Sequence, residues 1–256
     1  MILTMDIGNT NVKTALFEGM EMVEYWRVST NRDMSSDEYG ILLMNLFAHK
    51  GIQASQVEGI MISSVVPQIN FTIEHMCQNY FGMEPRIIGP GIKTGINIKY
   101  ENPRELGSDR IANAVAAYEL YGGPCITIDF GTATSFGAIS EKGEFLGGAI
   151  CPGLKLAAEA LTERAAKLPR FELAKPESVI GRNTVTNMQA GIVYGYIGQI
   201  NYLVERMKRE LGAPNAKVIA TGGLATLVAG ESNVIDVLDG LLTLKGLCLI
   251  YRRNVA

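Results

Sequence analysis

The chain has 256 residues, which is long enough for one large compact domain or for two of ordinary size. Hydrophobic residues make up 47% and charged residues 19%, a balance that is typical of folded proteins and argues against disorder. The formal net charge is −3, so no basic surplus is present to bind a nucleic acid through its phosphates.

The first half of the chain predicts an alternation of strands and helices. Apolar periodicity and turn residues define these elements, with Ser36 as the cap of the first helix and Pro67 as the end of the fourth strand. In chain order they are strands over 1–5, 12–17, 21–28 and 59–66 and helices over 35–50, 71–81 and 109–121, the first helix preceding the fourth strand. Such an order predicts a mixed sheet with helices on its faces.

The second half begins as the first does, with two strands around a Gly-Thr turn. The predicted strands cover 125–130, 135–140, 145–150 and 217–221, and the predicted helices cover 154–166, a long stretch from Thr184 to Leu211 and 238–251. Asn183 and Thr184 are candidate caps of the long helix. We therefore expect two domains, 1–121 and 122–256, of which the second repeats the first and carries the long helix.

The two hairpin turns share residue types that a tight turn does not itself require. Residues 6–13 and 129–134 each contain an Asp, one apolar residue, a Gly and a Thr-rich turn between two apolar runs. Glycine lets backbone N–H groups approach phosphate oxygens, Asp6 would hold a hydrated cation, and Lys13 would add positive charge. The alternative for one copy alone is an Asn/Gly hairpin turn with an exposed lysine. The presence of two copies favours the phosphate-binding interpretation.

Other residue types set limits on the chemistry. The two histidines, His49 and His75, lie far apart in sequence. This argues against a histidine-based zinc site and against a Ser-His-Asp triad. No stretch reaches the roughly 18 apolar residues of a membrane span. The chain starts without a leader pattern, and its scattered cysteines predict a cytoplasmic protein with unpaired thiols. These cysteines are Cys77, Cys125, Cys151 and Cys248.

Two hairpin-led halves, each with an Asp before a Gly-Thr turn, resemble the actin, sugar-kinase and Hsp70 superfamily. The resemblance implies an α/β fold of two ribonuclease-H-like halves, with mixed sheets flanked by helices, in which the paired hairpins enclose the phosphates of ATP. The late glycine turn of that superfamily, which lies under the adenosine, would be Thr221-Gly222-Gly223-Leu224. No Gly-Lys-Ser/Thr occurs, which argues against a Walker A loop.

A longer series of motifs resembles the type III pantothenate kinases from Met1 to about Tyr251. The motifs follow one another in this order: Asp6-Ile7-Gly8-Asn9-Thr10, Pro90-Gly91-Ile92-Lys93-Thr94-Gly95, Asn102-Pro103, Gly107-Ser108-Asp109-Arg110, Ile128-Asp129-Phe130-Gly131-Thr132-Ala133-Thr134 and Gly147-Gly148-Ala149-Ile150-Cys151-Pro152-Gly153. The resemblance implies an ATP-dependent kinase that converts pantothenate to 4′-phosphopantothenate, the first step of coenzyme A biosynthesis. The alternatives are a kinase of another small alcohol and an inactive nucleotide-binding transcriptional accessory protein.

The resemblance also implies roles for single residues on the substrate side. Asp109 would be the general base, although a first-turn acid of a helix is also simply favoured by the helix dipole. Gly107, Ser108, Asp109 and Arg110 would contact pantothenate, with Arg110 suited to its carboxylate. Tyr100 is a weaker candidate for this contact.

On the nucleotide side, the phosphates and Mg²⁺ would lie against the first hairpin, formed by Asp6, Ile7, Gly8, Asn9, Thr10, Asn11, Val12 and Lys13. Thr132 would contact ATP. Asp129 would bind a monovalent cation, K⁺ or NH₄⁺, unless it merely ends a strand.

A homodimer is the last implication of the resemblance. Thr184 would reach pantothenate from the neighbouring subunit, although a helix cap is its simpler interpretation. Gly191, Gly195 and Gly198 lie near one another on the long helix and permit close helix contact. That contact is either across a dimer or within the chain, and the residues leave the two open. No membrane or nucleic-acid partner is expected.

Overall fold

The computed structural model describes residues 1–165 and 167–255, so residue 166 of the predicted helix over 154–166 lies outside the described residues. Contacts divide the chain into two compact units. The first contains Met1–Ile96, Glu101–Ala116 and Leu241–Ala256, and the second contains Asn97–Tyr100 and Ala117–Gly240. The predicted domains, 1–121 and 122–256, stay a prediction.

The first unit is built on a mixed sheet with the strand order β3-β2-β1-β4-β5. Its strands are β1 (Ile2–Ile7), β2 (Asn11–Glu18), β3 (Glu21–Ser29), β4 (Gly59–Ser64) and β5 (Arg86–Ile87). Its helices are α1 (Ser36–His49), α2 (Asn70–Phe81), the start of α3 (Ser108–Tyr121) and α7 (Leu242–Val255), with short 3-10 turns at Ala54–Gln56, Pro67–Ile69 and Pro103–Glu105. β1 pairs antiparallel with β2 and parallel with β4.

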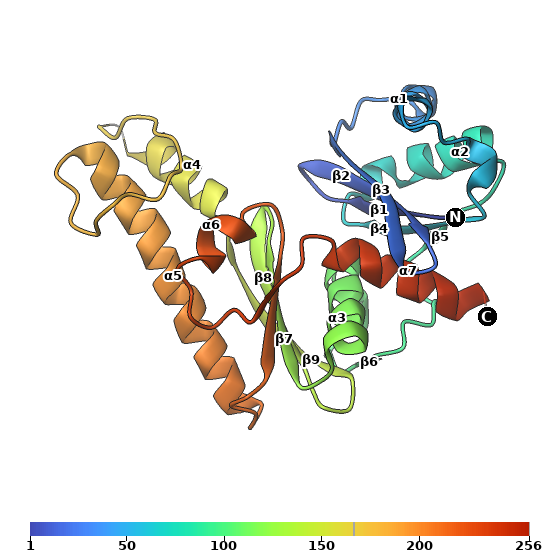
Figure 1. Ribbon diagram of the computed structural model, residues 1–256. Coiled ribbons are helices and arrows are strands. Elements are labelled where there is room, and N and C mark those ends of the chain that lie inside the picture. The colour runs from blue at the N-terminus through green and yellow to red at the C-terminus, as the bar shows by residue number, and fades with distance from the viewer. Residues whose placement is uncertain (166, 256) are drawn as a thin grey trace. The chain divides into compact units, whose positions relative to one another are not determined.

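Side chains along β1 alternate between the two faces of this sheet, and their contacts show which face each helix covers. Leu3, Met5 and Ile7 point into a core that α1 and α2 close with Phe47 and Met76. α7 packs against β1 and β4 on the opposite face, as Figure 1 shows. The residues between the core positions of β1 therefore face the α7 side of the sheet.

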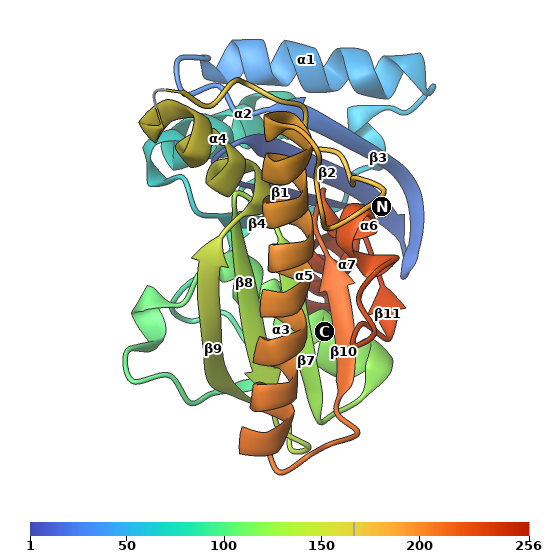
Figure 2. The same cartoon turned by 90° about the vertical axis from the view of Figure 1, so that its left-hand side faces the viewer.

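The second unit has a sheet with the strand order β11-β10-β7-β8-β9-β6. Its strands are β6 (Asn97–Ile98), β7 (Cys125–Phe130), β8 (Ala133–Ile139), β9 (Glu144–Pro152), β10 (Lys217–Thr221) and β11 (Val237–Leu238), and its helices are α4 (Leu154–Arg164), α5 (Thr184–Glu210) and α6 (Ala225–Ala229). α5 crosses one face of the sheet, as Figure 2 shows. Its Val193, Ile197 and Ile200 belong to the same buried core cluster as Ile128 and Phe130 of β7.

The two sheets repeat one plan, which confirms the predicted pair of mixed sheets flanked by helices. β7 pairs antiparallel with β8 and parallel with β10, as β1 does with β2 and β4. The outer pairs also correspond, because β2–β3 and β8–β9 are antiparallel, whereas β4–β5 and β10–β11 are parallel. Strand β6 is an addition at the edge of the second sheet.

Two boundaries differ from the sequence prediction. Ser35, not Ser36, caps α1: its hydroxyl accepts from the Glu38 backbone while the Glu38 side chain accepts from the Ser35 backbone, a reciprocal capping box. The last helix begins at Leu242 rather than Leu238, because Leu238 belongs to β11 and pairs with Ala220 of β10. Within the described residues, no helix is both long and apolar enough to cross a membrane.

Candidate active site

The first hairpin turn, residues 8–11, is held from within and from the end of β3. The Gly8 N–H donates to the Asn11 carbonyl at 3.0 Å, and a side chain at Gly8 would crowd that carbonyl at 3.2 Å. The Thr30 hydroxyl donates to the Gly8 carbonyl at 2.6 Å, and the Thr30 N–H donates to Thr10 at 3.0 Å. The turn is therefore fixed at both of its ends.

Asp6 and Lys13 face one another across this hairpin. They are partners in the β1–β2 register, and Lys13 Nζ lies 3.6 Å from Asp6 Oδ2. The Asp6 residue is only 7% exposed, so its carboxylate is screened little by solvent. A carboxylate with an ammonium beside a glycine turn is a donor set that can take both a hydrated divalent cation and phosphate oxygens.

Two arginines of the hairpin region were missed by the sequence reasoning. Arg27 Nε donates to Asn11 Oδ1 at 3.0 Å, and Arg32 Nη2 donates to Asn9 Oδ1 at 3.2 Å. Both side chains bring positive charge to the turn. Arg27 faces Lys13 in the β2–β3 register, but a shift of register at Leu16 and Phe17 precedes this pair, so the sequence alone does not indicate it. Arg32 follows the end of β3, and no short-range pattern placed it.

The start of α3 is fixed to the end of β4, the strand beside β1 of the hairpin. Ser108 Oγ lies 2.9 Å from Ser63 Oγ, accepts from the Ser64 N–H at 3.0 Å and donates to the Ser64 carbonyl at 3.0 Å. Ser63 is the register partner of Asp6 in the parallel β1–β4 pair. The helix that carries Asp109 therefore begins one strand away from the Asp6–Lys13 pair.

The first turn of α3 has a restrained geometry. Asp109 Oδ1 accepts from the Arg110 N–H at 2.8 Å, and Arg110 is 9% exposed. A Cβ at Gly107 would lie 2.5 Å from Asp109 Oδ1, so only glycine lets the carboxylate take this position. An acid in the first turn of a helix is favoured by the helix dipole, which stabilises its charged form. The charged carboxylate is the form that accepts a proton.

In the second unit, Asp129 and Thr132 lie on the second hairpin. Asp129 is the register partner of Thr221 on β10 and of Ser135 on β8. The Thr132 carbonyl accepts from the Gly153 N–H at 3.1 Å, and any side chain at Gly153 would collide with that carbonyl. Gly222, with φ +98°, packs against the Phe130 backbone. The predicted Thr-Gly-Gly turn thus lies directly beside the hairpin.

Tyr100 and Thr184 lie elsewhere in the second unit, Tyr100 in the loop after β6 and Thr184 on α5. The Tyr100 ring is 6.3 Å from the Phe145 ring, centroid to centroid. Thr184 is the first residue of α5, but the cap is Asn183, whose side chain accepts from the Thr186 N–H at 2.9 Å. The capping interpretation therefore belongs to Asn183. Thr184 instead lines a pocket of about 350 Å³ with Leu161 and Met188.

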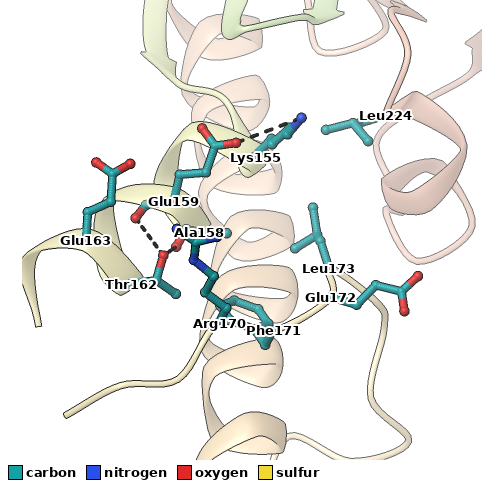
Figure 3. A pocket seen from close by; sticks show the side chains of 10 residues that line it. All are labelled: Lys155, Ala158, Glu159, Thr162, Glu163, Arg170, Phe171, Glu172, Leu173 and Leu224. Carbon is teal, nitrogen blue, oxygen red and sulfur yellow. Dashed lines mark hydrogen bonds and ion pairs between the residues drawn. The ribbon is translucent and has the colours of Figure 1, made fainter. Parts of the chain in front are cut away.

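A larger pocket of about 560 Å³ lies between α4, the segment 170–173 and Leu224. Figure 3 shows Leu173 and Leu224 on one side of it and Glu159, Glu163 and Arg170 on the other. The wall is therefore partly apolar and partly charged. Of the residues that line this pocket, only Leu224, at the end of the predicted glycine turn, lies in a sequence motif.

Similar solved structures share this fold. A protein from Campylobacter jejuni assigned to the Baf family of transcriptional activators is 20% identical over 99% of this chain and 98% of its own, with a TM-score of 0.63. The activator of the 2-hydroxyisocaproyl-CoA dehydratase from Clostridium difficile, solved with ADPNP, is 13% identical over 99% and 94%, with a TM-score of 0.57. A protein from Listeria monocytogenes assigned as an N-acetylmannosamine kinase is 12% identical over 100% and 99%, with a TM-score of 0.56.

These likenesses confirm the predicted fold, two ribonuclease-H-like halves of the actin and sugar-kinase kind. At such low identity they establish the fold alone. The sequence itself gives the more specific match: residues 2–206 fit a family model described as type III pantothenate kinase. That match covers most of the chain, including both hairpins, the start of α3 and Thr184. The chain belongs to the type III pantothenate kinase family.

Proposed function

We propose that this chain carries out the family reaction, ATP-dependent phosphorylation of pantothenate to 4′-phosphopantothenate in coenzyme A biosynthesis, with Asp109 as the general base. One observation carries the residue assignment: Ser108 ties the start of α3 to Ser63 and Ser64, on the strand beside Asp6. A base and a phosphate-binding hairpin thus belong to one compact unit.

ATP and Mg²⁺ would be held by Asp6, Ile7, Gly8, Asn9, Thr10, Asn11, Val12 and Lys13. Mg²⁺ in kinases is usually bound by one or two carboxylates together with substrate phosphates, and the buried Asp6 carboxylate supplies such a ligand. When bound, Mg²⁺ neutralises charge on the phosphates. Lys13 and the turn amides add positive potential.

Pantothenate would lie against Gly107, Ser108 and Arg110. Asp109 accepts the proton of the primary hydroxyl as its oxygen attacks the γ-phosphorus, and the bond to the β–γ bridging oxygen breaks to release ADP. A guanidinium binds a carboxylate with two parallel hydrogen bonds, which suits Arg110 to the substrate carboxylate. We assign Tyr100 and Thr184 to substrate contact as well, Thr184 from a partner subunit.

On the second hairpin we assign Thr132 to ATP and Asp129 to a monovalent cation, K⁺ or NH₄⁺. What supports this assignment is the repeated plan of the two sheets, in which Asp129 takes the place that Asp6 has in the first. The residue types fit a cation, because Thr221 and Ser135, the register partners of Asp129, both carry hydroxyl groups. The adenosine is expected beside the turn that ends at Leu224.

We also propose that the protein works as a homodimer. The support comes from Gly191, Gly195 and Gly198: a Cβ at any of them would meet no atom of the described residues within 4 Å. These glycines thus leave one part of α5 uncovered in the single chain. Replacing Gly195 with Leu should lower the dimer fraction in light scattering, whereas Lys208→Leu near the end of α5 should leave it unchanged. Equal dimer fractions for wild type and Gly195→Leu would contradict the proposed contact.

The decisive measurement of the reaction is ADP release with Mg-ATP and pantothenate, in KCl, NH₄Cl and choline chloride at equal ionic strength. Pantothenate-dependent turnover is expected, together with phosphorylated pantothenate in the mass spectrum. Turnover with a different small alcohol instead would support a kinase but exclude pantothenate as its substrate. An absence of turnover with every alcohol, although ATP binds, would favour a nucleotide-binding protein without the chemistry.

A further inference from the structure

Two arginines lie beside the turn of the first hairpin, and the first of them belongs to β3. Arg27 is the register partner of Lys13 on β2. Asn11 precedes Lys13 by two residues, so both project from the same face of the sheet as Arg27. A long side chain can reach the diagonal neighbour on its own face. The hydrogen bond from Arg27 Nε to Asn11 Oδ1, at 3.0 Å, is such a diagonal contact.

The second arginine makes the same kind of contact with the other neighbour of Thr10 in the turn. Arg32 follows the end of β3, and its Nη2 donates to Asn9 Oδ1 at 3.2 Å. The chain is held against the turn at this point, because the Thr30 N–H donates to the Thr10 carbonyl at 3.0 Å. Asn9 and Asn11 therefore flank Thr10, and each accepts a hydrogen bond from its own guanidinium.

A guanidinium decides which way a side-chain amide is turned. Its nitrogens donate and none of them accepts, so the end of the amide that faces it must be the carbonyl oxygen. The N–H₂ group, which carries two donors, then points away from the arginine. Among the described residues, neither Asn9 Nδ2 nor Asn11 Nδ2 has an acceptor. Asn9 is exposed and Asn11 is half-buried, so both N–H₂ groups can donate to a bound ligand.

The charges on this face of the sheet favour an anionic ligand. Lys13 on β2 stands between Asp6 on β1 and Arg27 on β3, so one carboxylate and two cations occupy three neighbouring strands. Like charges directly opposite one another destabilise a sheet. A phosphate group beside Lys13 and Arg27 would be attracted by both and would offset their repulsion.

We propose that Arg27 and Arg32 are positioning residues of the phosphate site, which hold the amides of Asn11 and Asn9 with their N–H₂ groups turned towards the phosphates of ATP. An amide that is already fixed loses little rotational freedom when it binds, and this raises the affinity. The guanidinium groups act through the two amides. The inference rests on the function proposed above, in which residues 6–13 hold ATP, and it adds two arginines outside that segment.

The test is a double-mutant cycle for each arginine and its amide. The Kd of Mg-ATP is measured by calorimetry without pantothenate, so the readout does not depend on turnover. In about 0.3 M KCl the Debye length is about 6 Å, which leaves little effect of charge alone. The variants are Arg27→Ala, Asn11→Ala and their combination, and likewise Arg32→Ala, Asn9→Ala and their combination. Arg86→Ala is the matched control, because Arg86 is an exposed arginine of β5, at the opposite edge of the same sheet.

Asn11→Ala should raise the Kd by about 10- to 100-fold, the effect of one lost hydrogen bond to a charged group. Arg27→Ala should raise it by about three- to tenfold, because an amide that is free to rotate must then be ordered on binding. The combined variant should match Asn11→Ala within about twofold, since the arginine acts only through the amide.

The pair of Arg32 and Asn9 should give the same pattern, and Arg86→Ala should leave the Kd unchanged. Effects that multiply in the combined variants would overturn the proposal, because each arginine would then act on ATP independently of its amide. A wild-type Kd in both arginine variants would overturn it as well.

Steady-state kinetics separate positioning from a general loss of structure. Arg27→Ala and Arg32→Ala should raise the KM for ATP and leave the KM for pantothenate and the Tm unchanged. Equal rises in both KM values, together with a lower Tm, would refute the positioning role. A wild type that binds Mg-ATP and shows the expected couplings, but does not phosphorylate pantothenate, would contradict the proposed function while leaving this inference standing. A wild type that does not bind Mg-ATP would overturn both.

Discussion

Asp109 carries the clearest prediction at the scale of the single residue. Asp109→Asn should lower kcat by about 10²- to 10⁴-fold, because an amide cannot accept the proton of the attacking hydroxyl. The fold should survive, since an Asn Oδ1 can still accept from the Arg110 N–H that Asp109 now binds at 2.8 Å. Steady-state turnover measures the expected fall in kcat, and thermal unfolding of the same preparation tests whether the fold survives.

The control for this variant is Glu119→Gln, which neutralises an exposed carboxylate further along α3. It should leave kcat unchanged. A kcat for Asp109→Asn within about threefold of the wild type would remove the residue from proton transfer, because general bases contribute far more than that.

Thr30 tests whether the first hairpin turn must be held in place. Thr30→Val keeps the shape but removes the hydroxyl that donates to the Gly8 carbonyl at 2.6 Å. One lost hydrogen bond corresponds to about a three- to tenfold rise in the KM for ATP, with a smaller change in the KM for pantothenate. Thr30→Ser retains the donor and should behave as the wild type. Equal rises in both KM values would point to a general loss of structure instead.

At the scale of the element, α7 determines where α3 lies in the first unit. The Thr243 hydroxyl donates to Asn113 Oδ1 at 2.7 Å in a buried contact between the two helices. Gly246 packs against the Ala112 backbone so closely that any side chain would overlap it. The last helix therefore supports the helix that carries Asp109, although the two are far apart in the sequence.

Gly246→Ala should consequently destabilise the protein. Overpacking of this kind costs about 1–3 kcal/mol, which corresponds to a fall of roughly 2–4 °C in Tm for each kcal/mol in a chain of this size. Thermal unfolding measures the effect. Gly230→Ala is the matched control, because a Cβ there meets no described atom within 4 Å and its φ of −68° suits alanine. A Tm for Gly246→Ala equal to that of Gly230→Ala would contradict the packing argument.

The elements also show which parts of the fold a sequence can predict. The hairpins around Gly8 and Gly131 were predicted because a glycine turn between two apolar runs is a local pattern. β11 and α6 were missed, since β11 is two residues long and defined by its pairing with β10, and α6 is a five-residue helix without a full period. Ser35 and Ser36 are equally good caps by type, and the reach of Glu38 decides between them.

The candidate site, like the fold, could be predicted only in part from the sequence. Asp6, Lys13 and Asp109 lie in motifs that resemblance identifies. The contact that brings them into one unit, Ser108 with Ser63 and Ser64, joins residues about 45 positions apart, and a single sequence gives no sign of it. The support from Arg32 and Thr30 depends on how β3 ends, which is likewise a matter of tertiary structure.

At the scale of the whole molecule, buried cysteines report on the two units separately. Cys77 belongs to the first unit and Cys125 to the second. Burial raises the pKa of the Cys77 thiol to about 12, with a contribution from the Glu74 charge, and burial likewise raises the pKa of Cys125 to about 12. Because the thiolate is the reactive form, at pH 8 only about one thiol in ten thousand is reactive, and unfolding should raise labelling sharply.

Removal of residues 241–256 should unfold the first unit and spare the second. The deletion takes away α7, which covers β1 and β4, so the apolar area lost exceeds what a marginally stable fold tolerates. After iodoacetamide treatment at pH 8, mass spectrometry should find Cys77 modified as fully as in urea and Cys125 still protected. Full-length protein with and without urea supplies the two reference values. Protection of both cysteines in the shortened chain would show that α7 is dispensable.

The polypeptide passes between the units at residues 96, 100, 116 and 240, so neither unit is a continuous piece of sequence. A protease nick between α4 and α5 would give two fragments, and each unit would then contain segments of both. Neither fragment includes all of the strands and helices of either unit. Co-expressed as separate polypeptides, they would have to fold around one another, and an enzyme split there would regain its structure only by complementation.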